Sequence, residues 1–242
     1  MLVLGLGSNV LATDAGFNGV VIRTAQGLTG LNAEPGGIIR CGAGVPLSRL
    51  CTFALENSLT GLEFAYGIPG TAGGGAYMNC GAYGGELADV LTACSHIGTD
   101  YLPGELTGKK LNMSYRRSAY CDNGCIITEL TLQLEPGDKA AVRARKDERT
   151  HKRRQKQPLE YPSAGSTFKR PQGYYAGALI EECGLKGAQI GGACVSKKHA
   201  GFIVNTGGAT SADILALIKH VQKTVFEAKG VMLEPEIKII EG

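Results

Sequence analysis

The segment that most constrains the fold is a glycine-rich run, residues 67–85, which reads G-I-P-G-T-A-G-G-G-A-Y-M-N-C-G-A-Y-G-G. Glycine loses more conformational freedom on folding than any other residue, so such a stretch is a costly choice for an ordinary core element. Dense glycine lets backbone N–H groups gather around an anion, or lets the chain lie flat against a planar ligand. A linker would be rich in serine and charge, and poor in Tyr, Met and Ile. The run therefore predicts a backbone surface shaped for a large phosphorylated cofactor.

Composition bounds the class of protein. The chain has 242 residues, of which 43% are hydrophobic and 19% charged, so a folded core is expected in one large domain or two small ones. A net charge of +3 is too small to indicate a nucleic-acid partner. No apolar stretch approaches the roughly 20 residues of a membrane span, and no signal peptide opens the chain. We therefore expect a cytoplasmic protein with neither nucleic acid nor membrane as a partner.

The eight cysteines predict neither a disulfide framework nor a metal site. Cys121 and Cys125 are close in sequence, but no second pair and no nearby histidine completes a zinc-ligand set. Free thiols in a reducing compartment are the expectation, and no metal is expected.

A second glycine turn lies near the start of the chain. The apolar segment Val3 to Gly7 reads as a strand that runs into G-L-G-S-N, Gly5 to Asn9. A strand followed by such a turn is a candidate phosphate cradle. It is not the dinucleotide-binding fingerprint, because the third glycine and the long following helix are absent.

Hydrophobic periodicity predicts a mixed α+β chain. The expected strands are Val20–Arg23, Ile38–Ala43, Val90–Ile97, Leu102–Leu106, Cys125–Leu134, Phe202–Val204 and a last strand over Val231–Ile240. The expected helices are Pro46–Asn57, Ala176–Cys183 and Thr210–Lys229, the last with a capping box at Thr210 and Asp213 and a stop at Gly230.

A turn around Pro136 predicts a boundary between a domain over residues 1–136 and a second over residues 137–242. The basic segment Asp138–Gln157 directly follows this turn. It lacks aromatic residues that could stack on bases, so we interpret it as a helix with a solvated basic face rather than a nucleic-acid site.

Three polar residues are candidates for chemistry. Arg116 could hold a carboxylate with its guanidinium fork, although a surface ion pair is the simpler interpretation. Ser166 could donate a proton, and a turn cap is its simpler role. Glu236 is expected on the last strand, facing away from Ile237, where an outward-pointing carboxylate is ordinary.

Six blocks of sequence, taken together, resemble the UDP-N-acetylenolpyruvoylglucosamine reductases, also called UDP-N-acetylmuramate dehydrogenases. The blocks are L-G-L-G-S-N-V-L (4–11), the glycine run (67–84), Y-R-R-S (115–118), Y-P-S-A-G-S-T-F-K-R-P (161–171), G-L-K-G-A-Q-I-G-G-A-C-V-S-K-K-H-A-G-F-I-V-N (184–205) and L-E-P-E-I-K (233–238). They run nearly end to end in the family's order. The chain is similar to the shorter type, which lacks a substrate-capping loop.

The resemblance implies an FAD-binding domain of the vanillyl-alcohol-oxidase type, followed by a small α/β substrate domain. It implies that NADPH reduces FAD, that hydride passes to C3 of the enolpyruvyl group of UDP-N-acetylglucosamine enolpyruvate, and that a serine protonates C2. The step belongs to peptidoglycan precursor synthesis. A monomer is expected.

The resemblance also implies roles for particular residues. The serine matches Ser166, and Arg116 and Glu236 match an arginine and a glutamate that stabilise the intermediate through the substrate carboxylate. Lys169 and Arg170 are implied contacts of the anionic substrate. The residues implied to bind FAD are Gly5, Gly7, Ser8, Asn9, Gly67, Ile68, Pro69, Gly70, Thr71, Gly74, Asn79, Gly81 and Tyr83.

The chain departs from the family pattern at its start. Family members carry a βαβ segment before the L-G-x-G-S-N block, whereas this chain begins with Met1 almost on the block, as a truncated form or a misassigned start would. Loss of that segment would remove sheet partners from strand Val3 to Gly7. Two alternatives to the reductase stay open at this point: a different flavin oxidase on the same FAD domain, and a non-catalytic remnant that binds a UDP-sugar or a partner.

Overall fold

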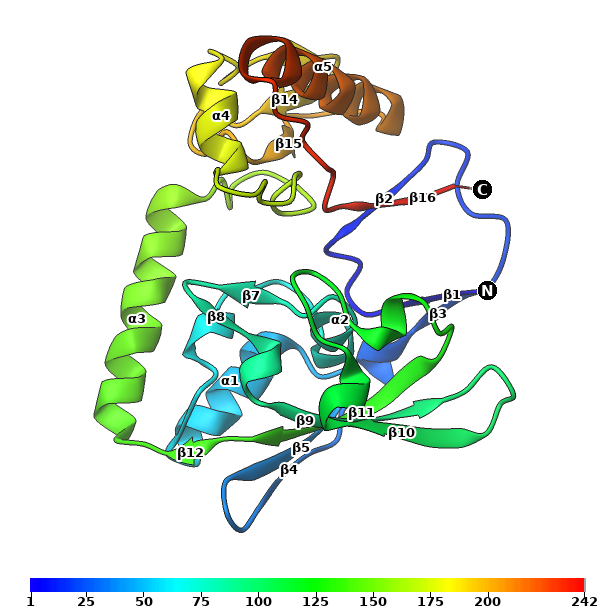
Figure 1. Ribbon diagram of the computed structural model, residues 1–242, viewed down its shortest axis with the longest axis vertical. Coiled ribbons are helices and arrows are strands. Elements are labelled where there is room, and N and C mark those ends of the chain that lie inside the picture. Colours follow the sequence, from blue (N-terminus) through cyan, green and yellow to red (C-terminus); the bar gives the residue numbers. More distant parts are fainter. Residues whose placement is uncertain (242) are drawn as a thin grey trace. The chain divides into compact units, whose positions relative to one another are not determined.

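The structure, a computed structural model, describes residues 1–241 and divides into two compact units (Figure 1). Unit 1 comprises Met1–Gly7 and Val20–Arg153, and unit 2 comprises Ser8–Gly19 together with the chain from Arg154 onward. The boundary expected after Pro136 stays a prediction. The compact units part later, between Arg153 and Arg154, because most of the helix that follows Pro136 packs on unit 1.

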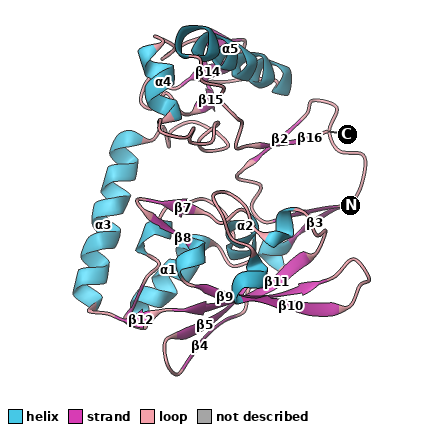
Figure 2. Cartoon of the chain, viewed as in Figure 1, coloured by secondary structure: helices cyan, strands magenta, loops and turns pink. Residues whose placement is uncertain are grey.

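The centre of unit 1 is a five-stranded antiparallel sheet in the order β10-β9-β11-β5-β4 (Figure 2). Its strands are β4 (Leu31–Glu34), β5 (Ile38–Gly42), β9 (Leu91–Ile97), β10 (Pro103–Thr107) and β11 (Ile126–Gln133). Alternation along β11 places Leu130 and Leu132 in the core, where neither has exposed surface. Leu130 stands opposite Cys41 of β5 and Cys94 of β9, so one buried row crosses the sheet. The four expected strands of this sheet, β5, β9, β10 and β11, are confirmed to within two residues, whereas β4 was not expected.

Two helices of unit 1 differ in how far the sequence predicted them. Helix α1 (Leu47–Glu56) buries Leu47, Leu50, Cys51 and Ala54, the face that the periodicity predicted. Helix α2 (Ala72–Tyr77) lies inside the glycine run, where only a flat loop was expected. That expectation was wrong for these six residues.

Short strand pairs and turns of 3-10 helix complete unit 1. Strand β1 (Leu2–Leu4) pairs in parallel with β3 (Val21–Arg23), and both contribute to a two-stranded sheet. The other pairs are β6 (Leu59–Thr60) with β12 (Glu135–Pro136), and β7 (Gly81–Ala82) with β8 (Gly85–Glu86). The 3-10 turns are η1 (Thr24–Gln26), η2 (Glu63–Ala65), η3 (Leu87–Asp89), η4 (Gly108–Leu111) and η5 (Ala119–Cys121).

Unit 2 is a small α/β fold. Its helices are α4 (Ala176–Glu182) and α5 (Ser211–Lys229), beside the antiparallel strands β13 (Gln189–Ile190), β14 (Ala193–Val195) and β15 (Ile203–Asn205). The capping box of α5 is confirmed: Thr210 Oγ1 accepts from Asp213 N, and the Asp213 carboxylate accepts from Thr210 N. Gly230 ends the helix with a φ of 67°, as the sequence predicted.

The segment Ser8–Gly19 belongs to unit 2 for two reasons. Its strand β2 (Val10–Ala12) pairs in parallel with β16 (Lys238–Ile240). The carboxylate of Asp14 accepts from the backbone N–H groups of Ser211 and Ala212 at the start of α5, and the bond from Ser211 N–H contributes most to a lowered Asp14 pKa. Two contacts distant in sequence therefore hold this segment against the end of the chain.

The last expected strand was too long. Only Lys238–Ile240 forms β16, while Glu236 lies before it and pairs with a different segment. Pro235 forms an isolated antiparallel bridge with Phe168, so this part of the chain pairs with the segment around Thr167 rather than with β2. Among residues 1–241, no helix is both long and apolar enough to cross a membrane.

Candidate functional site

The glycine run folds as a tight helical turn against strand β5. Thr71 caps α2 by accepting from Gly74 N at 3.2 Å, while the N–H groups of Ala72 and Gly73 donate to Val45 O and Ala43 O. A Cβ on Gly73 would come within 2.7 Å of Ala43 Cβ. These first-turn N–H groups therefore bond within the protein, and the glycines here serve close packing of the helix on its neighbour.

The other side of the run presents exposed backbone. Gly67, Pro69 and Gly74 are exposed, and a Cβ on Gly74 would meet no atom closer than Thr71 Oγ1 at 3.4 Å. Tyr77 lies beside them with 37% of its surface exposed. Bare backbone bordered by an aromatic ring is a surface against which a planar group can lie.

Gly5 meets the glycine run at Thr71. A Cβ on Gly5 would stand 2.2 Å from Thr71 Oγ1, so only glycine allows this approach. Gly7 has a φ of 69°, and the chain passes from unit 1 to unit 2 directly after it. The structure thus brings two sequence-predicted glycine segments together through Gly5 and Thr71.

The implied FAD residues are divided between the units. Ser8 and Asn9 belong to unit 2, and the other eleven belong to unit 1: Gly5, Gly7, Gly67, Ile68, Pro69, Gly70, Thr71, Gly74, Asn79, Gly81 and Tyr83. Asn9 donates through Nδ2 to Glu236 O at 3.3 Å, and its own carbonyl accepts from Lys238 N at 2.9 Å.

Arg116 sits on a turn that is tied to the glycine run. Its φ is 56°, a left-handed conformation that non-glycine residues rarely adopt. Its guanidinium donates to Gly81 O at 3.1 Å and to Asn79 O at 3.5 Å, and lies 5.0 Å from the ring centroid of Tyr115. Backbone outliers of this kind concentrate at functional sites, where the surrounding structure holds them.

Ser166 and Glu236 lie on neighbouring segments of unit 2. Thr167, next to Ser166, accepts at its backbone O from Glu236 N at 2.8 Å. Thr167 is buried, and its Oγ1 accepts from Ile203 N at 3.0 Å, while Ser166 is exposed. The anchor at Thr167 therefore holds Ser166 at the surface of unit 2, near Glu236.

The two implied substrate contacts of unit 2 already have partners within it. Lys169 Nζ forms an ion pair with Glu234 Oε1. The guanidinium of Arg170 stacks on the ring of Tyr175 at 4.0 Å. Both side chains are placed by their neighbours, and their role toward the substrate stays a prediction.

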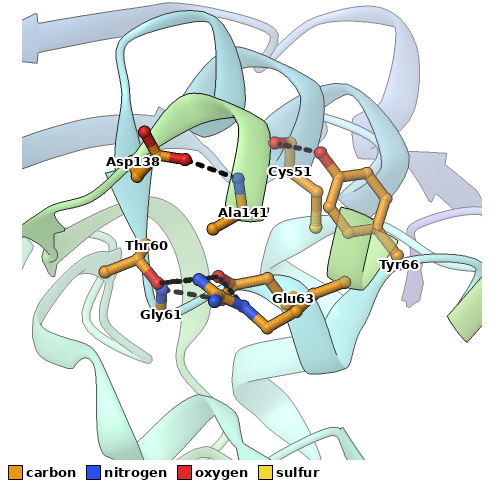
Figure 3. A network of polar contacts seen from close by, with 8 residues as sticks. Cys51, Thr60, Gly61, Glu63, Tyr66, Asp138 and Ala141 are labelled. Carbon is orange, nitrogen blue, oxygen red and sulfur yellow. Dashed lines mark hydrogen bonds and ion pairs between the residues drawn. The ribbon is translucent and has the colours of Figure 1, made fainter. Parts of the chain in front are cut away.

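The basic segment forms helix α3 (Lys139–Lys156), and its interpretation as a solvated face was only partly right. Three side chains spaced four residues apart contact the rest of unit 1, and they belong to Arg145, Arg149 and Arg153. Arg145 pairs with the buried carboxylate of Glu63, in the network that Figure 3 shows. The guanidinium carbons of Arg149 and Arg153 lie 5.6 and 5.4 Å from the ring centroid of Tyr83.

Arginine side chains were assigned to solvent because charge alone predicts exposure. The missed signal was their spacing, since residues four apart share one helix face. Arg149 and Tyr83 also line a groove of about 770 Å³ in unit 1, with Glu63 and Asp89 among its other polar residues.

Sequence reasoning missed two buried anchors of the site. Thr167, described above, holds the Ser166 segment. Ser118 has 1% of its surface exposed, and its Oγ donates to Tyr77 O at 2.7 Å, which ties the Y-R-R-S turn to the glycine run. Both lie within two residues of a predicted site residue, so their small polar side chains beside those positions were the available signal.

Comparisons with known proteins agree with this arrangement. The family model for an FAD-binding domain matches residues 1–97, and that for the C-terminal domain of UDP-N-acetylenolpyruvoylglucosamine reductase matches residues 157–240. The α+β class with an FAD-binding domain is confirmed. The exposed backbone at Gly67 and Gly74 fits FAD, because the absence of a side chain there lets a planar group lie against the chain.

Relatives resemble the chain over almost its full length. A UDP-N-acetylenolpyruvoylglucosamine reductase of Clostridium perfringens is 48% identical over 98% of this chain and 78% of its own, and one of Geobacillus thermodenitrificans is 48% identical over the same shares. A crystal structure of the reductase (MurB) from Thermus caldophilus superposes with a TM-score of 0.85 at 36% identity, covering 98% of this chain and 84% of that one. The chain therefore belongs to the UDP-N-acetylenolpyruvoylglucosamine reductase family.

Proposed function

We propose that this protein is an FAD-dependent oxidoreductase that uses NADPH to reduce UDP-N-acetylglucosamine enolpyruvate to UDP-N-acetylmuramate, in peptidoglycan precursor synthesis. Family membership supports the reaction. The structural observation that supports it is the backbone bond between Glu236 N and Thr167 O, which joins the segment of the candidate proton donor Ser166 to the segment of Glu236. We further propose that the protein acts as a cytoplasmic monomer.

When bound, FAD would supply the redox chemistry of the reaction, which is the transfer of hydride from NADPH to C3 of the enolpyruvyl group. The exposed backbone of Gly67, Pro69 and Gly74 would hold FAD, together with Gly5 and Thr71. These residues would bind and orient FAD without transferring protons, because none of them carries an acidic or basic group.

Hydride addition at C3 leaves negative charge on C2 and the attached carboxylate. Arg116 stabilises that charge as an oriented cation, which is the largest effect that such a site usually offers. Glu236 helps only when its carboxyl group carries a proton, since two ionised carboxylates would repel each other. Ser166 Oγ then gives its proton to C2, and the product has gained one hydride and one proton.

The proposal is tested by separating the two half-reactions. FAD-reconstituted protein should show a flavin absorption band near ~450 nm, and NADPH should bleach it. Ser166→Ala should keep this bleaching but lose reoxidation of the flavin by the enolpyruvyl substrate, by about 10²- to 10⁴-fold.

Ser163→Ala is the matched control, because Ser163 is an exposed serine of the same loop. It should leave both half-reactions near those of the unchanged protein. A folded protein that binds no FAD would refute the flavoenzyme assignment. Normal reoxidation in Ser166→Ala would remove Ser166 as the proton donor while leaving the reaction itself in place.

A further inference from the structure

We propose that Asn79 is a positioning residue for Arg116: its buried side-chain amide fastens the turn that carries the arginine to the glycine run. The inference rests on the proposed role of Arg116 in the reaction. It assigns to Asn79 a task distinct from the cofactor contact that the sequence resemblance implied.

The amide of Asn79 is committed to the protein at both ends. The residue has no exposed surface. Its Nδ2 donates to Ser114 O at 2.9 Å, and its Oδ1 accepts from Ala88 N at 3.0 Å. Ser114 and Arg117 pair through two backbone hydrogen bonds and close the turn that bears Arg116. The bond from Asn79 Nδ2 to Ser114 O therefore holds this turn where it begins.

The side chain of Arg116 also binds the segment that contains Asn79. Its Nη2 donates to Gly81 O at 3.1 Å and its Nη1 to Asn79 O at 3.5 Å. Ser118 adds a third connection through Tyr77 O. The two segments are therefore joined by bonds on both sides of Asn79, and the guanidinium is held by the carbonyl groups of Asn79 itself and of Gly81.

The backbone supports the same interpretation. Asn79 has a φ of 45°, and Arg116 a φ of 56°. Asparagine tolerates the left-handed conformation better than most residues, and it also supplies a donor and an acceptor, which glycine cannot. Asparagine therefore combines tolerance of the left-handed backbone with a side chain that can both donate and accept a hydrogen bond.

The expected consequence is a loss of rate rather than of binding. A displacement of a catalytic group by about 1 Å can cost 10²-fold, because charge stabilisation depends on fixed geometry. Loosening the turn should therefore lower kcat for the enolpyruvyl substrate more than it raises KM. Reduction of the flavin by NADPH should change little, since no negative charge then develops beside Arg116.

The experiment compares variants of the full FAD-loaded chain by stopped-flow absorbance of both half-reactions and by steady-state kcat and KM. Asn79→Gly keeps the backbone conformation and removes the amide. Asn79→Asp keeps the acceptor for Ala88 N and removes the donor to Ser114 O, and it serves if the glycine variant fails to fold. Tyr120→Phe is the matched control, because it deletes two other hydrogen bonds of a buried residue on the adjacent turn η5, one to Cys94 O and one with His96 Nδ1, each 3.0 Å long.

We expect either Asn79 variant to lower kcat with the enolpyruvyl substrate by about 10²-fold, and to slow NADPH-dependent flavin reduction by a much smaller factor. Tyr120→Phe should leave both rates within about threefold. In an Arg116→Ala background, Asn79→Gly should add less than about a twofold loss, because residues that act as one unit are not additive.

The outcomes separate the two levels of the argument. If Arg116→Ala is slow but both Asn79 variants turn over normally, the positioning role is wrong and the proposed function stands. If the Asn79 loss is fully additive to that of Arg116→Ala, or equals that of Tyr120→Phe, Asn79 serves stability alone. If Arg116→Ala turns over normally, the role of Arg116 fails, and the positioning inference fails with it.

Discussion

Replacement of Glu63 by glutamine is the most direct test of how helix α3 is attached to unit 1. Its carboxylate accepts four hydrogen bonds: from Thr60 Oγ1 at 2.7 Å, Gly61 N at 2.8 Å, and Arg145 Nε and Nη2 at 3.0 and 2.7 Å. Figure 3 shows this network below the start of α3, where Asp138 accepts from Ala141 N. A glutamine can accept at one oxygen only, and its NH₂ group must face a donor.

The size of the effect follows from burial. Hydrogen bonds to charged groups contribute about 1.5–3 kcal/mol, and breaking a fully buried ion pair costs about 3–5 kcal/mol. Glu63 is 9% exposed at its side chain, but Arg145 is 44% exposed and can regain water. We therefore expect Glu63→Gln to lower the free energy of unfolding by about 2 kcal/mol, or Tm by about 4–8 °C for a chain of this length.

The loss should depend on pH in a particular direction. Burial raises the pKa of Glu63, but the hydrogen bonds from Thr60, Arg145 and Gly61 outweigh it and leave the pKa at about 2, below its ordinary value of 4.5. A lowered folded-state pKa means that the contribution is complete above about pH 4.5 and is lost as pH falls toward about 2. The difference between the two proteins should therefore shrink across this window.

Urea unfolding followed by circular dichroism, at pH 7 and at steps between pH 5 and 2.5, measures both effects. Glu148→Gln is the control, because Glu148 forms an exposed pair with Lys152 on the same helix and should leave the urea midpoint close to that of the unchanged protein. Equal midpoints for Glu63→Gln and the unchanged protein at pH 7 would refute the reasoning. So would a difference that stays constant down to pH 2.5.

Three further substitutions test the glycine run and helix α5. Gly74→Ala should raise stability by up to about 0.5–1 kcal/mol, because the Cβ has room, while weakening FAD binding measured by fluorescence titration; unchanged FAD affinity would place the flavin elsewhere. Gly73→Ala should instead destabilise by about 1–3 kcal/mol in thermal melts, since its Cβ would clash with Ala43. Thr210→Ala should cost about 1 kcal/mol in urea unfolding by removing the cap that accepts from Asp213 N, and a cost near zero would contradict the observed capping box.

The extent to which sequence predicted the fold differs between element types. Strand β11 and helices α1 and α5 are placed by alternation, periodicity and caps, which are local signals that tertiary contacts leave in force. Helix α2 was missed because glycine disfavours helices, yet packing against Val45 and Ala43 holds it. Glu236 was expected on the last strand, but the chain around Pro235 pairs with Thr167 and Phe168, and only Lys238–Ile240 forms β16.

The candidate site shows the same division. The sequence by itself determined the family, the positions of the glycine segments that are expected to bind FAD, and the chemical types of Arg116, Ser166 and Glu236, because these depend on residue identity within motifs. Only the tertiary structure decided that Thr167 joins the serine segment to Glu236. It also decided that the side-chain amide of Asn79 donates to Ser114, on the turn that bears Arg116, and accepts from Ala88. A hydrogen bond between segments distant in the chain depends on where folding brings two backbones, and no local pattern of residues encodes that distance.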